Sequence, residues 1–323
     1  MILAGDIGGT NTRLALFESS GDLKIIVEKK YPSRQHKGLE EIVRLFLTEQ
    51  KANVRAACFG IAGPILNGRV TLPNLPWIVD TTELSKNLHI PSVHLLNDLQ
   101  ANANGLKALK KEELFLIQAG KKQEGNQALL SAGTGLGEAG LFWNGHEHLP
   151  FACEGGHTDF APRNSLEIEL LLYAKKKFDH VSYERIVAGP GLHLLYEFLL
   201  ETGREKRSKE VAEAMKGKDP SAAIGEFGLQ NKDSACIHTI DWFLSLLGAE
   251  AGNLALKFLS LGGLFLGGGI APRFATHFAK SDFLRSFADK GRFKSLLESI
   301  PIYIVMNDNT ALLGAARYAI TKL

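Results

Sequence analysis

One short segment near the start of the sequence combines a carboxylate with a glycine-rich turn. Residues 6–11 read DIGGTN and lie between two apolar runs, 2–4 and 14–17. Adjacent glycines let the backbone approach a ligand closely, and successive turn N–H groups can form a concavity for an anion. Asp6 could hold a cation, or the water bound to it, beside such an anion. The pattern indicates a site for a metal-bound nucleotide, although a glycine hairpin with an incidental aspartate has the same pattern.

Two further glycine segments also follow apolar runs. Residues 133–137 read GTGLG between the apolar runs 128–132 and 139–143, which repeats the strand–turn–strand form of the first segment. Residues 267–269 are three glycines that could admit a planar adenine or ribose, or simply form a tight bend. The formal GxGxxG match at 135–140 is followed by a strand-like run, and no GxxxxGK[ST] pattern is present. Neither a Rossmann site nor a P-loop is therefore indicated.

The pair Asn97-Asp98 directly follows the apolar run 93–96. Side chains at the carboxyl end of a strand in an α/β sheet commonly face the ligand crevice. Asp98 could accept a proton from a substrate hydroxyl while Asn97 fixes the substrate by hydrogen bonds. The same pair could instead cap a helix that begins near Leu99.

The segment 154–160 reads EGGHTDF and is rich in polar groups. Two glycines allow a turn that aims Glu154 and His157 at one point, and a carboxylate can accept hydrogen bonds from two vicinal hydroxyls. This pattern favours ligand binding. A metal site is not indicated, because only one histidine is present and no second cluster lies nearby. Glu184 precedes the turn signal 187–191 and, without further context, is interpreted as a charge on a helix surface.

The elements that would position these residues alternate between strands and helices. Strand-like runs alternating with helical periodicity indicate a mostly parallel or mixed α/β sheet. Two hairpins, each opening one half of the chain, predict a duplicated architecture with a cleft between the halves. The expected elements are a hairpin at 2–16, a helix at 39–49, a buried strand at 56–62, a helix opening at 81–84 with a threonine N-cap, a strand at 93–96, a second hairpin at 128–143, helices at 166–178, 191–202 and 237–258, strands at 264–266 and 302–305, and a helix at 310–320.

Composition narrows the class of protein. The 323 residues are 45% hydrophobic and 22% charged, with a formal net charge of +2, which shows no bias toward nucleic acid or an anionic membrane. Three cysteines lie far apart without a CxxC pair, so neither a zinc cluster nor a disulfide framework is supported. The most apolar region, 254–271, contains a lysine and several glycines and is too interrupted to span a bilayer. We expect a soluble, cytoplasmic protein that binds neither nucleic acid nor membrane.

Together these motifs resemble those of the bacterial glucokinase family, within the superfamily of sugar kinases, actin and heat-shock chaperone ATPases. Residues 6–10 are similar to the first phosphate motif of that superfamily, 131–137 to the second, and 266–270 to the adenosine motif. The finer glucokinase matches are 96–98, 154–162 and 184–185. The cysteine-rich zinc motif of the other large group of bacterial glucokinases is missing, so the resemblance is to the zinc-free group. The loop 74–77 departs locally from the family pattern.

The resemblance implies an α/β fold of two domains, a duplicated ribonuclease H-like (actin-like ATPase) fold with an interdomain cleft. The small domain would comprise 1–109 plus 305–323 and the large domain 110–304. The implied activity is phosphorylation of glucose at its 6-hydroxyl in glycolysis, with ATP and Mg²⁺, by a homodimer. Asp98 would be the catalytic base and would bind the sugar together with Asn97, Glu154, His157 and Glu184. The implied nucleotide-binding residues are Asp6 (which would also hold the metal through water), Gly8, Gly9, Thr10, Asn11, Gly133, Thr134, Gly135, Gly267, Gly268 and Gly269.

Three other functions share part of this pattern. A kinase for another hexose or an amino sugar would carry the same motifs. A nucleotide-driven ATPase or binding module of the same fold would not need the carboxylate-rich segment at 154–160. A sugar-responsive regulator that binds without turnover is disfavoured by the intact Asp98. Glucokinase is the predicted function.

Overall fold

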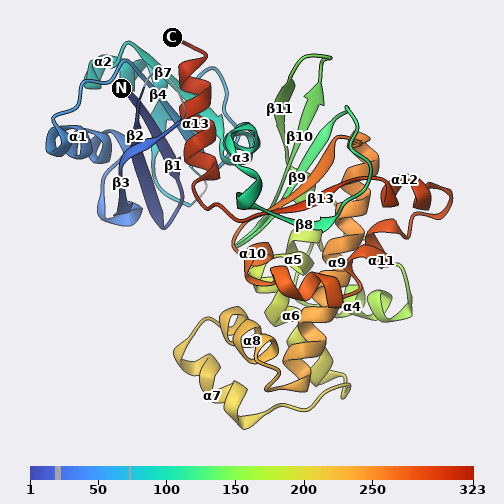
Figure 1. The fold of residues 1–323 in the computed structure, drawn as a ribbon. Helices are drawn as coiled ribbons and strands as arrows, with labels where there is room; N and C mark the ends of the chain where they lie inside the picture. The colour runs from blue at the N-terminus through green and yellow to red at the C-terminus, as the bar shows by residue number, and fades with distance from the viewer. Residues whose placement is uncertain (19–22, 73) are drawn as a thin grey trace. The chain divides into compact units, whose positions relative to one another are not determined.

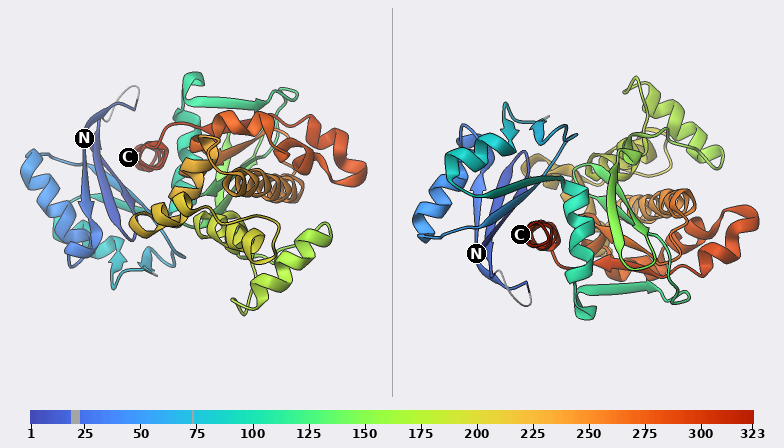
Figure 2. Two further views of the ribbon diagram at one scale, coloured as in Figure 1. Left: turned by 90° about the horizontal axis from the view of Figure 1, so that it is seen from below. Right: turned by 90° about the horizontal axis from the view of Figure 1, so that it is seen from above.

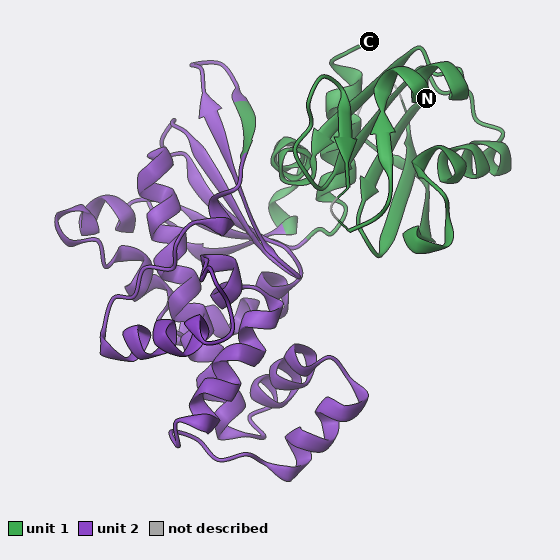
Figure 3. Cartoon of the chain, turned by 180° about the vertical axis from the view of Figure 1, so that it is seen from behind, with its two compact units in different colours: residues 1–113, 149–152, 307–323 green, residues 114–148, 153–306 purple. Residues whose placement is uncertain are grey.

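The computed structural model describes residues 1–18, 23–72 and 74–323. These residues form two units, coloured separately in Figure 3. The first unit comprises 1–113, 149–152 and 307–323, and the second comprises 114–148 and 153–306. The sequence predicts a small domain of 1–109 plus 305–323 and a large domain of 110–304, and this division stays a prediction.

The first unit is built on a five-stranded sheet in the order β3-β2-β1-β4-β7. Strand β1 pairs antiparallel with β2 and parallel with β4, and β4 pairs parallel with β7. The predicted hairpin and the two predicted strands of this half are confirmed. Strand β3 was not predicted, because most of its side chains are exposed or half-buried and its sequence is rich in charge. The strands are β1 (Ile2–Ile7), β2 (Asn11–Phe17), β3 (Ile25–Pro32), β4 (Ala56–Ile61) and β7 (Ser92–Asn97), beside a small pair, β5 (Arg69–Thr71) and β6 (Ile78–Asp80).

The second unit repeats this strand order. Its sheet runs β11-β10-β9-β12-β13-β8, so β9 takes the place of β1, β12 that of β4 and β13 that of β7, with β8 as an added antiparallel edge. The predicted duplication is confirmed, and the chain has the α/β, actin-like ATPase fold. The strands are β8 (Leu114–Gln118), β9 (Gln127–Ala132), β10 (Leu136–Trp143), β11 (His148–Cys153), β12 (Gly263–Gly267) and β13 (Ile302–Val305).

Helices cover both faces of the first sheet (Figure 1). Since strand side chains alternate between faces, Leu3 and Ile7 pack with α1 (Leu39–Gln50) and α2 (Thr81–Leu88), whereas Ile2 and Ala4 pack against α13 (Thr310–Ile320). Figure 2 shows α13 end-on beside the strands of this sheet. Helix α13 also packs closely on α3 (Asp98–Gly105), where a Cβ on Gly314 would lie 1.8 Å from the Ala101 carbonyl oxygen.

In the second unit a long apolar helix, α9, lies at the centre of the helical layer and packs against α5, α6, α8 and α11. The predicted helices at 166–178, 191–202 and 237–258 correspond to α4, α6 and α9, and that at 310–320 has the bounds of α13. The helices are α4 (Ser165–Lys175), α5 (Tyr183–Val187), α6 (Gly189–Glu201), α7 (Lys209–Gly217), α8 (Pro220–Leu229), α9 (Ser234–Phe258), α10 (Ile270–Arg273), α11 (Phe283–Ala288) and α12 (Lys294–Glu298).

The N-terminus of α2 differs from the prediction. The predicted threonine N-cap of α2 is wrong: Asp80 caps this helix, and its Oδ1 accepts from the N–H groups of Thr82 and Glu83 at 2.9 and 3.2 Å. An ionised carboxylate is favoured there by the positive end of the helix dipole.

Among the described residues, no helix combines the length and apolar character needed to cross a membrane.

Candidate active site

In the first unit, the turn between β1 and β2 is held by short-range hydrogen bonds. The N–H of Gly8 donates to the Asn11 carbonyl at 2.9 Å, and Ser33 Oγ donates to the Gly8 carbonyl at 2.8 Å. A Cβ on Gly9 would lie 3.0 Å from the Cβ of Asn74, so a larger residue would press on that neighbour. Thr10, at the tip of this turn, is exposed. The turn therefore presents backbone and a hydroxyl to solvent on a braced loop.

Asn97 and Asp98 form the junction between β7 and α3. The Asn97 side-chain oxygen accepts from the N–H groups of Leu99 and Gln100 at 3.0 and 3.4 Å, which makes it the N-cap of α3. Asp98 Oδ1 accepts from the Leu99 N–H at 2.8 Å. The sequence allowed this pair to be a helix cap, and the structure shows that cap. It fixes both side chains at the carboxyl end of the strand and leaves the Asn97 amide N–H₂ as a donor.

The sheet brings Asp6 near Asp98. Asp6 is opposite Gly60 on β4, and Gly60 is in turn opposite Leu96, just before the Asn97-Asp98 pair. A Cβ on Gly60 would lie 2.8 Å from Ala101 Cβ and 3.9 Å from Asp98 Cα, so this glycine leaves the space that α3 occupies. Gly60 is a site-shaping residue that sequence reasoning missed, since a glycine inside a buried strand was its only signal.

The pKa of Asp6 reflects this crowding. Burial raises the pKa of the Asp6 carboxyl above its ordinary value, the Arg13 guanidinium opposes that effect, and the charges of Asp98 and Glu28 add to it. Arg13 donates to Glu28 at 2.7 Å, to the Asp308 carbonyl at 2.7 Å and to the Asn309 side chain. Neighbouring carboxylates that repel one another favour a cation bound between or beside them.

In the second unit, the turn between β9 and β10 meets two other glycine segments. The N–H of Gly189 donates to the Gly133 carbonyl at 2.7 Å, and Gly133 N–H donates to the Gly135 carbonyl at 2.8 Å. Gly268 has φ of +78°, and a Cβ there would lie 2.2 Å from the Ala132 carbonyl oxygen. A Cβ on Gly133 or Gly269, by contrast, would meet open space. The structure thus brings the predicted second phosphate segment and the predicted adenosine segment together, with bare backbone accessible.

Glu184 is tied to the same turn. Its Oε2 accepts from the Leu136 N–H at 3.0 Å, and a Cβ on Gly135 would lie 2.5 Å from that oxygen. His157 Nδ1 lies 3.9 Å from Glu184 Oε1, and the His157 side chain is exposed. The interpretation of Glu184 as a helix-surface charge, drawn from its local sequence, is therefore wrong. Only the long-range pairing of α5 with the β9–β10 turn reveals its position.

Glu154 and His157 belong to one short loop, residues 154–157, which we call the Glu154 loop. It contains a single 3₁₀ turn at Gly155–His157, and the Glu154 carbonyl accepts from the His157 N–H at 3.1 Å. A Cβ on Gly156 would lie 2.0 Å from the Leu136 carbonyl, so the loop lies directly on the start of β10. Glu154 is exposed. The second unit therefore gathers Glu154, His157 and Glu184 around residues 135–136.

The site residues fall into two sets, one on each unit. The first holds two carboxylates, Asp6 and Asp98, and an amide donor; the second holds two carboxylates, an imidazole and glycine backbone. Among the described residues, no group of three or more histidine, cysteine, aspartate or glutamate side chains could ligate a metal. One carboxylate next to a braced glycine turn fits Mg²⁺, which keeps several waters and shares its remaining ligands with substrate phosphates.

Comparison with known proteins identifies the family. The sequence model of the family described as "Glucokinase" matches residues 3–322. A glucokinase of Trichormus variabilis is 44% identical, with 98% of each chain covered, and one of Escherichia coli O139:H28 is 37% identical, covering 98% of this chain and 96% of the relative. The crystal structure of a glucokinase from an Antarctic psychrotroph is 31% identical with a TM-score of 0.86, covering 99% of this chain and 98% of that one. With the matching motifs on an actin-like fold, the chain belongs to the glucokinase family of sugar kinases.

Proposed function

We propose that the protein transfers the terminal phosphoryl group of ATP to the 6-hydroxyl of glucose. The observation that carries this proposal is Asp98, a carboxylate fixed by the cap of α3 at the carboxyl end of a strand. In phosphoryl transfer the protein mainly positions the reactants and stabilises charge, and one carboxylate orients and deprotonates the attacking hydroxyl. Asp98 takes this role, and its contact with the Leu99 N–H sets the orientation of the carboxyl group.

Each set of residues carries groups that suit the hydroxyls of a sugar. Asn97 offers an N–H₂ group, because its oxygen is engaged in the cap. Glu154, His157 and Glu184 accept hydrogen bonds from vicinal hydroxyls, as carboxylates and an imidazole can. A sugar lacking one of these hydroxyls, or carrying it in the other configuration, leaves a desolvated carboxylate oxygen unpaired, which costs far more than a poor apolar fit.

Phosphate binding rests on the glycine turns. The backbone N–H groups of Gly8–Thr10 and of Gly133–Gly135 bind phosphate oxygens, and the bare backbone of Gly267–Gly269 supports the adenosine. Asp6 holds the hydration shell of Mg²⁺, which supplies charge neutralisation on the phosphates when bound. In this proposal the nucleotide-binding residues are Asp6, Gly8, Gly9, Thr10, Asn11, Gly133, Thr134, Gly135, Gly267, Gly268 and Gly269.

The proposal extends to cellular setting and assembly. We place the enzyme in the cytoplasm, at the entry of glucose into glycolysis, as a homodimer that uses ATP with Mg²⁺. A kinase for another hexose or an amino sugar is the nearest rival, since the same residues would serve it.

The first experiment measures ADP formation by the purified protein with Mg²⁺-ATP, alone and with each member of a hexose panel. We expect ADP release that depends on glucose and falls sharply with mannose, fructose and glucosamine. Preference for another sugar would reassign the substrate. ADP release that is indifferent to every sugar would overturn the kinase assignment, and would favour an ATPase of the same fold.

A further inference from the structure

Two carboxyl groups outside the proposed site are buried against each other in the second unit. Glu138, on β10, is 1% exposed and Glu250, on α9, is fully buried. They are close enough for the charge of Glu250 to act on the Glu138 carboxyl. Within the described part of the chain, Oε1 of Glu138 is buried without any hydrogen-bond donor. Two ionised carboxylates buried next to each other repel strongly, which favours a proton on one of them.

The surroundings supply little positive charge to this pair. Glu250 accepts from Asn253 Nδ2 at 2.8 Å and from Lys257 Nζ at 3.4 Å, and the Lys257 side chain is about half exposed. Exposed cations are screened by water and compensate a buried carboxylate poorly. One such lysine does not balance two buried negative charges.

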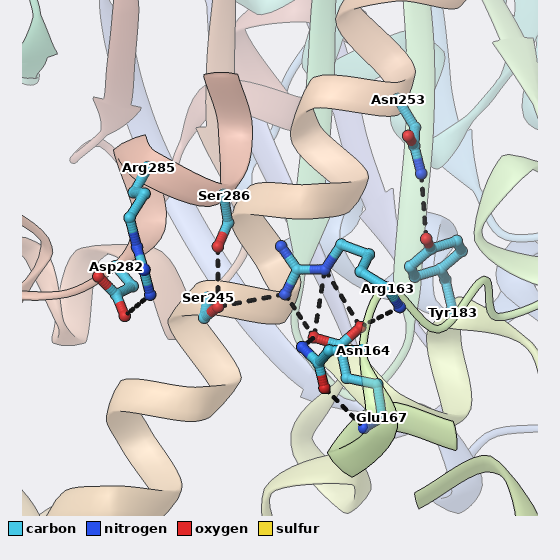
Figure 4. Close-up of polar contacts among 9 residues, drawn as sticks. All are labelled: Arg163, Asn164, Glu167, Tyr183, Ser245, Asn253, Asp282, Arg285 and Ser286. Atoms are coloured by element: carbon cyan, nitrogen blue, oxygen red, sulfur yellow. Dashed lines mark hydrogen bonds and ion pairs between the residues drawn. The ribbon is translucent and has the colours of Figure 1, made fainter. Parts of the chain in front are cut away.

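The other titratable neighbours do not remove the imbalance. The Tyr183 hydroxyl bonds Asn253, as Figure 4 shows, and burial raises the pKa of Tyr183 to about 12. Burial likewise raises the pKa of the Cys153 thiol, so both groups stay neutral near pH 8. Lys290 donates to Asn253 at 2.7 Å, but burial and then the charge of Arg163 lower its pKa. Glu154 is a further negative neighbour of Cys153.

The pKa of Glu138 responds to these surroundings. Burial, followed by the charge of Glu250, raises it to about 8, with Lys257 as the opposing influence. Glu138 therefore carries a proton at neutral pH and loses it in mildly alkaline solution. A buried carboxyl kept neutral in this way can act as a hydrogen-bond donor.

Glu138 lies immediately beneath the Glu154 loop. A Cβ on Gly155 would lie 1.8 Å from Glu138 Oε2, and Cys153 Sγ donates to the Glu138 carbonyl at 3.5 Å. The same strand carries Leu136, whose N–H holds Glu184 and whose carbonyl abuts Gly156. The carboxyl group of Glu138 thus forms the floor on which Glu154 and His157 are presented.

We propose that Glu138 is a positioning residue for sugar binding, and that its proton, held beside the buried carboxyl of Glu250, keeps the Glu154 loop in its binding conformation. The inference rests on the proposed function, in which Glu154 and His157 bind the sugar. Loss of the proton places a second charge under Gly155, and the loop must shift to let water reach it. Asp98 belongs to the first unit, whereas Glu138 and the Glu154 loop belong to the second, apart from Asp98 in the sequence.

The sign and size of the expected effect follow from the titration. Only the protonated pair holds the loop, so the binding-competent fraction falls as pH rises through about 8. At one pH unit above that midpoint about a tenth remains competent, so the glucose KM rises about tenfold. At saturating glucose the competent form is repopulated, so kcat stays within about twofold.

The experiment compares the pH profiles of glucose KM and kcat, from about pH 6.5 to 9, for the intact enzyme and three variants. Glu138→Gln keeps the shape and stays neutral, so we expect its glucose KM to match the parent near pH 7 and remain flat to pH 9. Lys257→Gln removes the cation that lowers the pKa of Glu138, so the rise in KM moves to higher pH. The control is Glu167→Gln: Glu167 is also 1% exposed but is paired with Arg163 at 2.6 Å (Figure 4). Its KM profile should follow that of the parent.

A second readout does not depend on turnover. Infrared difference spectra should show a protonated carboxylic acid that titrates near pH 8 in the parent and is absent in Glu138→Gln. Hydrogen exchange at residues 154–157 should accelerate over the same range only in proteins that retain Glu138. A KM that is flat with pH in the parent, or identical rises in the parent and Glu138→Gln, would overturn this inference while leaving the kinase intact. Absence of sugar-dependent ADP formation at every pH would instead remove the proposed function.

Discussion

Strands β1 and β7 of the first unit correspond in sheet position to β9 and β13 of the second. In the first unit these strands lead to Asp6 and to Asn97-Asp98, so two carboxylates lie near each other. In the second unit β9 leads to the open glycine turn at Gly133. Strand β13 leads back into the first unit at Asn307-Asp308, where the Asp308 carbonyl accepts from Arg13 and the Asp308 side chain is exposed. The two sheets therefore share a strand order but differ at their strand ends. The first sheet carries the carboxylates Asp6 and Asp98 there, whereas β9 of the second sheet ends in the bare backbone of a glycine turn.

The sharpest way to break this comparison is to replace, one at a time, the aspartates that follow β7 and β13. Asp98→Asn should lower kcat by about 10²-fold or more, because it removes the proton acceptor from the reacting hydroxyl. Asp308→Asn, at an exposed aspartate that follows β13, should leave kcat within about twofold. Steady-state kinetics with glucose and ATP measures both. A near-normal kcat in Asp98→Asn, or an equal loss in Asp308→Asn, would contradict the assignment.

A second test concerns the sugar-binding side of the second unit. Glu154→Gln should raise the glucose KM about tenfold or more, since a hydrogen bond to a charged group is worth about 1.5–3 kcal/mol. The ATP KM should change little. Asp159→Asn is the matched control, because Asp159 follows in the same segment, is exposed and is paired with His180 at 3.5 Å. Similar losses for both ligands would point to a structural role for Glu154.

A third test uses the open glycine turn. A Cβ on Gly133 would meet no atom within 4 Å, so Gly133→Ala should fold normally. We expect the ATP KM to rise several-fold, because the added methyl group holds the phosphates away from the turn N–H groups. Gly217→Ala, which also meets open space but lies at the end of α7, is the control. An unchanged ATP KM in Gly133→Ala would remove this turn from nucleotide binding.

The smallest expected effect is on stability and concerns Asp6. Its raised pKa means that the folded protein binds this proton more tightly than the unfolded chain. Folding stability therefore falls as pH rises through the interval between the unfolded and folded pKa values, and the loss is complete above the folded value. Asp6→Asn should raise Tm by a few degrees at neutral pH without added metal, while activity declines. A lower Tm in calorimetry would show that the Asp6 charge is stabilising.

The fold was largely predictable where the sequence has strong apolar runs. Strand β13 and helix α13 have the bounds expected from the sequence, because β13 is a short continuous apolar run and α13 is rich in apolar residues over three turns. Strands β3, β8 and β11 escaped prediction, since most of their side chains are exposed or half-buried and their sequences lack clear alternation. Their register depends on neighbouring strands, which no local pattern records.

The candidate site was predictable in its residue types and less so in its contacts. Asn97 could be foreseen as either a cap or a ligand; the structure shows the cap and leaves its amide available. Glu184 had no local signal, because its partner, the Leu136 N–H, is distant in sequence. Glu138 was not singled out for the same reason. A glutamate in a strand attracts notice only when the structure shows Glu250 of α9 beside it. The roles of these residues stay predictions until the variants are measured.

The packing of α13 bears on how the protein is made. This helix follows the last strand of the second unit, yet it covers one face of the first sheet, against Ile2, Ala4 and Cys58. During synthesis on a ribosome, that face stays exposed until the whole second unit has been translated. The first unit therefore cannot complete its core as a nascent chain, and the order of translation makes its folding wait for residues 310–320. A protein truncated before residue 310 would have an incomplete first unit with an exposed apolar sheet face. Cellular quality control can recognise such a surface, which also promotes aggregation.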